Sequence, residues 1–139
     1  MTKHERIAAL AAAFAGTDVD PRYAGYFVLF NRQEFYVAHD VLEDLWLADR
    51  RGANGDFYKG LIQLAGAFVH LQKNRLAPAA AVFRLAQANL AKYPARHERL
   101  DVKAALALIE SWLRQLDSSP ANPLSPANVP QLASPTGLA

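Results

Sequence analysis

The chain has 139 residues, a length that fits one domain with a single hydrophobic core. Apolar residues make up 52% of it and charged residues 20%, and 15 Lys and Arg against 13 Asp and Glu give a net charge of +2. This composition is typical of a globular soluble protein and lacks the strong basic excess of a dedicated nucleic-acid binder. Cysteine is absent, which excludes disulfides, thiolate zinc sites and cysteine nucleophiles.

The amino end resembles an export signal, because Lys3 and Arg6 precede an apolar run that ends in Ala13-Phe14-Ala15. A cleavage there would leave an apolar region of only about six residues, and Glu5 interrupts the positive flank. We therefore expect a short first helix, ended by Gly16. No apolar run approaches the ~18–20 residues that cross a bilayer, so the sequence predicts a cytoplasmic protein without a membrane segment.

Two further helices are predicted from their capping residues. Asp18 or Asp20 can cap a second helix, whose first turn carries a proline. Asn31 and the residue three positions later, Glu34, form a capping-box pattern. A third helix is therefore expected from about residue 32 to residue 49.

The next part of the chain predicts three more helical segments. Asp56 can cap a fourth helix that starts at Phe57, and Asn74 and Pro78 bracket a turn before a fifth helix that continues to Pro94. A final helix carries one apolar face: Val102, Ala105, Leu106, Ile109, Trp112, Leu113 and Leu116. No strand with sustained alternation is present. The sequence therefore predicts an all-α fold, a single compact bundle of about five to six helices.

Residues 118–139 differ from the rest, because they include no charged side chain and hold five of the eight prolines. We expect residues 1–117 to form the domain and this Pro-rich segment to be a flexible or extended tail. Docking of the tail on a partner or on the domain itself is the alternative. Removal of a free tail would leave the melting temperature unchanged.

The third helix places two titratable residues near its apolar stripe. At 100° per residue, Phe35, Leu42 and Trp46 define the stripe, His39 falls inside it, and Glu43 lies at its edge. A partly buried imidazole needs hydrogen-bond partners, and Glu43 is placed to accept one bond. One interpretation is thus a structural pair that holds two helices together.

The fourth helix offers further polar residues on one stripe, with Gly66 and Ala67 between them: Gln63, His70 and Asn74. If small residues let this helix approach the third one closely, a polar pocket lined by Trp46 would form from His39, Glu43, Gln63 and His70. The alternative is an ordinary solvated face made of Lys59, Gln63, His70 and Lys73. A metal ion in such a pocket would have His39, Glu43 and His70 as candidate ligands, although their spacing matches no established metal motif.

Two segments carry a family resemblance: FNRQEFYVAHDVLEDLW, and FYKGLIQLAGAFVH with Asn74 after it. They resemble the DUF309 family, a small all-helical domain of bacteria, archaea and plastids that is named for having no known function. The resemblance extends over about residues 26–90. The family's motif residues fall on His39, Glu43, Trp46, Gly60, Leu61, Ile62, Gln63, His70 and Asn74. The first acid of its His-Glu pair is Asp40 here, and the Gly-Ala that usually follows the asparagine is absent near Ala77 and Pro78.

The resemblance implies a shared polar cluster without a substrate: His39, Asp40, Glu43, Trp46, Gln63, His70 and Asn74. Two function classes remain open. The protein is predicted to be an interaction or scaffold module that binds a protein partner or a second copy of itself. The alternative is a small-molecule or metal-binding hydrolase-like enzyme that uses His39, Glu43 and His70. Nucleic acid is not expected as a partner, because basic and acidic residues are interspersed along the chain.

Overall fold

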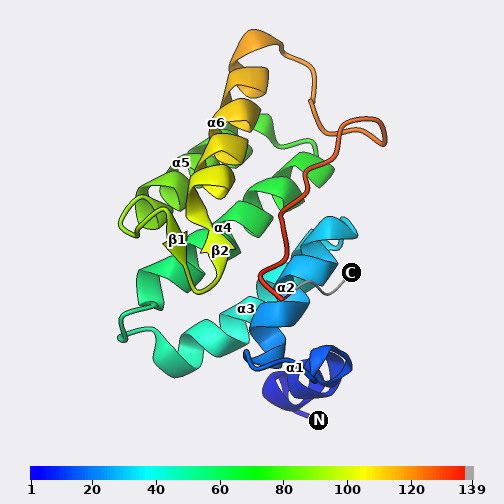
Figure 1. The fold of residues 1–139 in the computed structure, drawn as a ribbon. Coiled ribbons are helices and arrows are strands. Elements are labelled where there is room, and N and C mark those ends of the chain that lie inside the picture. The colour runs from blue at the N-terminus through cyan, green and yellow to red at the C-terminus, as the bar shows by residue number, and fades with distance from the viewer. Residues whose placement is uncertain (137–139) are drawn as a thin grey trace.

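Six α-helices follow one another in the computed structural model, which describes residues 1–136 (Figure 1). They confirm the predicted all-α bundle. A 3₁₀ turn, η1 (Ala12–Phe14), follows the first helix, and a hairpin of two-residue strands, β1 (Arg96–His97) and β2 (Leu100–Asp101), precedes the last. The helices are α1 (Lys3–Ala11), α2 (Pro21–Asn31), α3 (Phe35–Asp49), α4 (Gly55–Gln72), α5 (Leu76–Leu90) and α6 (Val102–Ser118).

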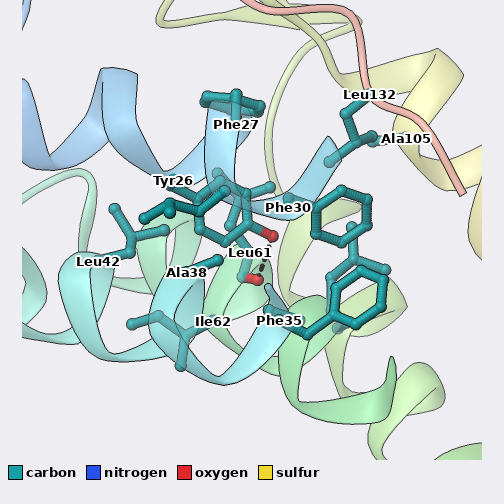
Figure 2. Packing of buried hydrophobic residues seen from close by; sticks show 14 of the residues in the cluster. Tyr26, Phe27, Phe30, Phe35, Ala38, Leu42, Leu61, Ile62, Ala105 and Leu132 are labelled. Carbon is teal, nitrogen blue, oxygen red and sulfur yellow. Dashed lines mark hydrogen bonds between the residues drawn. The ribbon is translucent and has the colours of Figure 1, made fainter. Parts of the chain in front are cut away.

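The core is built around α2, which is buried on all sides from Tyr23 to Phe30. Each helix from α2 to α6 packs on the next one along the chain. Phenylalanine rings from α2, α3 and α4 meet in the centre, where Phe30 and Phe35 both contact the ring of Phe68. The hydroxyl of Tyr26 donates a 2.6 Å hydrogen bond to the carbonyl of Leu61, so the α2–α4 contact is specific as well as apolar (Figure 2).

The α2–α3 junction differs from the predicted capping box. Asn31 is the last residue of α2, and α3 begins at Phe35 after Glu34, whose side chain makes no capping bond. The backbone N–H of Glu34 donates to Leu29 and that of Gln33 to Phe30, while Gln33 takes a left-handed φ of 66°. These are the bonds of a Schellman motif, so the stretch ends one helix instead of starting the next.

Three other boundaries can be compared with the sequence. Asp20 caps α2, as predicted, by accepting the N–H of Arg22. Helix α4 starts at Gly55 instead of Phe57, and Asp56 lies in its first turn without acting as the cap. Helix α5 starts at Leu76, so Pro78 lies in its first turn instead of in the turn before it. A proline is tolerated there, because the N–H that it lacks would have no helical partner.

The Pro-rich segment lies in an extended form on the helical body, passing from the end of α6 over α4 to α2 (Figure 1). Leu132 is only 6% exposed and belongs to the core cluster. This is the docked arrangement that the sequence left open. Among residues 1–136, no helix is both long and apolar enough to span a membrane.

Candidate functional site

Two neighbouring cavities follow the seam between α3 and α4. The first has a volume of about 160 Å³ and the second about 180 Å³, and both open to the surface. Together we call them the α3–α4 groove. Its residues are Tyr36, His39, Glu43 and Trp46 on α3 and Lys59, Ile62, Gln63, Gly66, Val69 and His70 on α4. Because early α3 residues share a cavity with late α4 residues, the two helices are antiparallel.

The first cavity has unfilled space beside Gly66. A Cβ atom built on this glycine would lie 3.9 Å from Cδ2 of His39 and 3.9 Å from Cγ1 of Val82, which is ordinary van der Waals contact. Gly66 is therefore not required for close helix packing, contrary to expectation. A close approach is required instead at Gly60, and it is to α5: a Cβ there would lie 2.9 Å from Cγ of Leu90.

Two histidines line this cavity. The Nδ1 atom of His70 is buried and has no hydrogen-bond partner within the described chain. The ring of His39 is 29% exposed, and its Nδ1 lies 3.1 Å from Oδ1 of Asp40. Because a carboxylate only accepts, this contact places the proton of His39 on Nδ1 and directs Nε2 away from Asp40.

Glu43 is not the hydrogen-bond partner predicted for His39. Its Oε2 atom lies 3.9 Å from Nε2 of His39, which is an ion-pair distance too long for a hydrogen bond. Glu43 instead accepts a 3.2 Å bond from Lys3, at the start of α1. This hydrogen bond raises the pKa of the Lys3 ammonium group above its ordinary value.

The second cavity contains the remaining polar candidates. Trp46 and Ile62 supply its apolar surface, and Glu43, Lys59 and Gln63 supply polar atoms. The Oε1 atom of Gln63 accepts a 2.8 Å bond from Asn89 of α5, which fixes the amide. The predicted residues thus share one groove, but they are divided between two cavities.

Asn74 lines neither cavity. It follows α4 with a left-handed φ of 56°, and the N–H groups of Asn74 and Arg75 donate to Leu71 and His70. These bonds form a second Schellman motif, and asparagine tolerates the left-handed conformation better than most residues. The position of this motif residue is therefore accounted for by helix termination.

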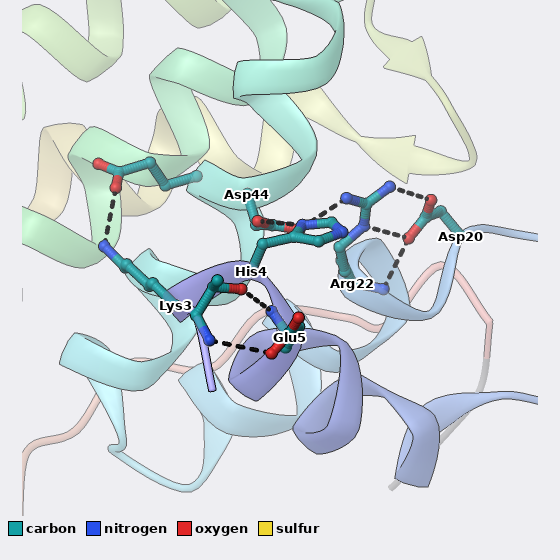
Figure 3. A network of polar contacts seen from close by, with 8 residues as sticks. Lys3, His4, Glu5, Asp20, Arg22 and Asp44 are labelled. Carbon is teal, nitrogen blue, oxygen red and sulfur yellow. Dashed lines mark hydrogen bonds and ion pairs between the residues drawn. The ribbon is translucent and has the colours of Figure 1, made fainter.

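A second polar network adjoins the groove and ties α1, α2 and α3 together (Figure 3). Asp44, one residue after Glu43, accepts bonds from Nδ1 of His4 at 2.8 Å and from Arg22 at 2.7 Å. Arg22 also makes a two-point contact with Asp20. Burial raises the pKa of Asp44, but the bonds from His4 and Arg22 outweigh it, and the pKa lies below its ordinary value.

A metal centre has no preformed donor set in the part of the chain that the structure describes. Among residues 1–136, no group of three or more His, Asp or Glu side chains is placed to hold one ion. His39 and His70 line one cavity and Glu43 lines the other. A metal at these residues remains a prediction from sequence and requires rearrangement of the groove.

Sequence reasoning missed two residues of this region. Tyr36 is 61% exposed and its ring lies 6.3 Å from that of His39, a position that the spacing of three residues on α3 could have indicated. Lys3 carried no such signal, because it lies 40 positions from Glu43 in the sequence.

Comparison with known proteins supports the motif-based resemblance. No curated protein and no solved structure matches the chain. The family model described as Domain of unknown function (DUF309) matches residues 23–82, which include most of α2, all of α3 and α4, and every residue of the groove. The resemblance predicted from the two motifs is therefore confirmed over residues 23–82.

Proposed function

We propose that the protein is an interaction module that binds a short segment of a partner protein in the α3–α4 groove. The observation that carries this proposal is the first cavity, which has unfilled space beside Gly66 and is lined by His70, a histidine whose buried Nδ1 has no partner in the described chain. A glycine inside a helix costs about 1 kcal/mol relative to alanine. No packing contact requires Gly66, so the space itself is the feature that a ligand would use.

The dimensions of the groove favour a protein segment over a small molecule. Small-molecule sites are usually enclosed and hold about 300–1,000 Å³. The two cavities, of about 160 and 180 Å³, are open and lie in line. Tyr36 is 61% exposed at one end of the groove, and Trp46 lines the cavity at the other. Aromatic side chains of this kind are enriched where proteins meet.

The hydrolase-like enzyme is the second candidate, and the His39–Asp40 contact is the observation that favours it. A carboxylate on Nδ1 orients an imidazole so that Nε2 can accept a proton from a substrate or water. This candidate requires His39, Glu43 and His70 to act on one ligand. Their division between two cavities makes it the weaker proposal.

Peptide selection tests the interaction proposal. A displayed library would be selected on the wild-type protein, and the affinity of each selected peptide measured by fluorescence polarisation. We expect His70→Ala and Gly66→Ala to weaken binding by at least about tenfold, since one removes an imidazole that lines the cavity and the other places a methyl group in it. Arg84→Ala, at a separate cavity between α5 and α6, is the matched control and leaves the affinity unchanged. Selected peptides that bind all four proteins equally would contradict the proposal.

Elemental analysis separates the two candidates. The protein would be purified without chelators or metal-affinity columns, beside a His39→Ala, His70→Ala double variant. The interaction proposal predicts the same metal content in both. Near-stoichiometric zinc, iron or manganese that is absent from the variant would support the enzyme instead.

A further inference from the structure

The C-terminal segment is held by a two-point contact at the end of α2. The N–H of Leu132 donates to Oδ1 of Asn31 at 2.8 Å, and its carbonyl accepts from Nδ2 of Asn31 at 2.7 Å. One side-chain amide thus pairs with both backbone groups of a single residue, as a neighbouring β-strand would. This contact recognises an extended backbone.

Alternate side chains of the segment enter the body. Pro130 and Leu132 are buried, whereas Gln131 between them is exposed. Leu132 joins the same buried cluster as Phe30 and Ala105 (Figure 2). The alternation is that of an extended chain, with a proline and a leucine two residues apart facing the body.

Glutamine amides complete the contact without any charged group. The Nε2 atom of Gln33 donates to the carbonyl of Pro130 at 3.3 Å, and that of Gln131 donates to the carbonyl of Asn31 at 3.0 Å. Residues 118–139 carry no charged side chain. Recognition therefore depends on hydrogen bonds and on two buried side chains.

The connection to α6 contacts the body less closely than this end does. It is attached at two points: Asn122 donates a 2.6 Å bond to the carbonyl of Leu71, and Asn128 donates a 2.7 Å bond to Oε1 of Gln115 on α6. Between Asn122 and Asn128, residues 125–127 are exposed, and Val129, which follows Asn128, is 40% exposed. A cavity of about 300 Å³ lies between this part of the segment and the helical body. It is lined in part by Gln33, whose Oε1 has no partner in the described chain.

We propose that the end of α2 is a peptide-recognition site for extended, uncharged segments with the sequence Pro-x-Leu. The chain's own Pro130–Leu132 occupies the site in cis. A tethered segment has an effective concentration on the order of millimolar, so a partner's segment binds when it displaces the tail. This site is separate from the α3–α4 groove and does not depend on the function proposed for that groove.

The test uses a full-length chain that carries Leu132→Asp, which opens the site, and a fluorescent peptide of residues 121–136 with the wild-type sequence. We expect the peptide to bind this variant and to bind the wild-type chain at least about tenfold more weakly, because the tail competes. Adding Asn31→Ala to the variant, or Leu132→Asp to the peptide, weakens binding by at least about tenfold. Equal binding of both peptides, or no binding to a variant that circular dichroism shows to be folded, would overturn the proposal.

A second measurement covers the case in which Leu132→Asp prevents folding. A protease site would be placed at the exposed residues 125–127, and the wild-type chain would be cut after folding. We expect the C-terminal fragment to remain bound during gel filtration and to be displaced by excess peptide. A dimer formed by exchange of tails, and dissociated by the same peptide, also supports the site. Immediate loss of a fragment that does not rebind contradicts it.

Discussion

Gly66 is the residue whose substitution most directly tests the space in the groove. A methyl group there would meet His39 and Val82 at ordinary contact distance, and alanine favours a helix over glycine by about 1 kcal/mol. We therefore expect Gly66→Ala to increase the free energy of unfolding by up to about 1 kcal/mol, measured by urea denaturation. Stability would rise while peptide binding falls, as expected where a functional cavity is retained at a cost in stability.

Gly60→Ala is the matched control on the same helix. A Cβ at Gly60 would lie 2.9 Å from Cγ of Leu90, which is fully buried, and 3.2 Å from Cβ of Asn89. Overpacking of this kind usually costs about 1–3 kcal/mol, so this variant should be destabilised. If Gly66→Ala were destabilised as well, the space in the first cavity would not be available to a ligand.

Asp44 of α3 helps to hold helix α1 against the rest of the fold. Its side chain accepts bonds from His4 of α1 and from Arg22 of α2. The side chain is only 11% exposed, and removing its charge leaves Arg22 with one carboxylate instead of two. We expect Asp44→Asn to lower the free energy of unfolding at pH 7 by about 1–3 kcal/mol. The loss would be measured by urea denaturation.

The pH dependence follows from the lowered pKa of Asp44 in the folded protein. Its contribution is fully present above the ordinary value of 3.8 and is lost as the pH falls through the lower folded value. The difference between wild type and Asp44→Asn should thus be large at pH 7 and disappear once the pH falls below the lowered pKa of Asp44 in the folded protein. Glu110→Gln is the control, because the Glu110–Arg114 pair is exposed and should be worth less than about 1 kcal/mol. A pH-independent difference would mean that the Asp44 charge does not stabilise the fold.

The helices were predictable because the apolar residues that form each buried face recur at helical spacing within one segment. In α6, the predicted residues Val102, Ala105, Ile109 and Trp112 are all buried. The predicted helix boundary was wrong where a residue of the local capping pattern bonds a residue far away in the sequence. Asn31 matched a capping box within four residues, but its side chain bonds Leu132, 101 positions away. No local rule includes such a contact.

The candidate groove was predictable to the same extent. The 3.6-residue period placed His39 and Glu43 on one face of α3, and Gln63 and His70 on one stripe of α4, and these faces do meet. The individual bonds were not predictable, because they use residues from other elements: Lys3 for Glu43, and Asn89 for Gln63. Sequence periodicity defines faces, whereas packing decides the partners within them.

At the scale of the whole molecule, the C-terminal segment connects the last helix, α6, with α4 and α2. It leaves α6, contacts the end of α4 through Asn122, and closes on α2 through Leu132. Composition suggested that this segment could be removed without effect. The burial of Leu132 indicates the opposite, because the core would lose an apolar side chain and Asn31 would lose two hydrogen bonds.

We expect truncation after Asp117 to lower the free energy of unfolding by about 1–3 kcal/mol. Burial of a leucine stabilises by about 1.5–3 kcal/mol, and the freedom that the released segment regains offsets part of the total loss. Thermal denaturation followed by circular dichroism measures the effect. Two full-length variants identify its source: Leu132→Ser should reproduce most of the loss, whereas Val129→Ser, at a residue that is 40% exposed, should leave the melting temperature nearly unchanged. If the truncated chain and Leu132→Ser both melt as the wild type does, the segment adds nothing to the stability of the fold.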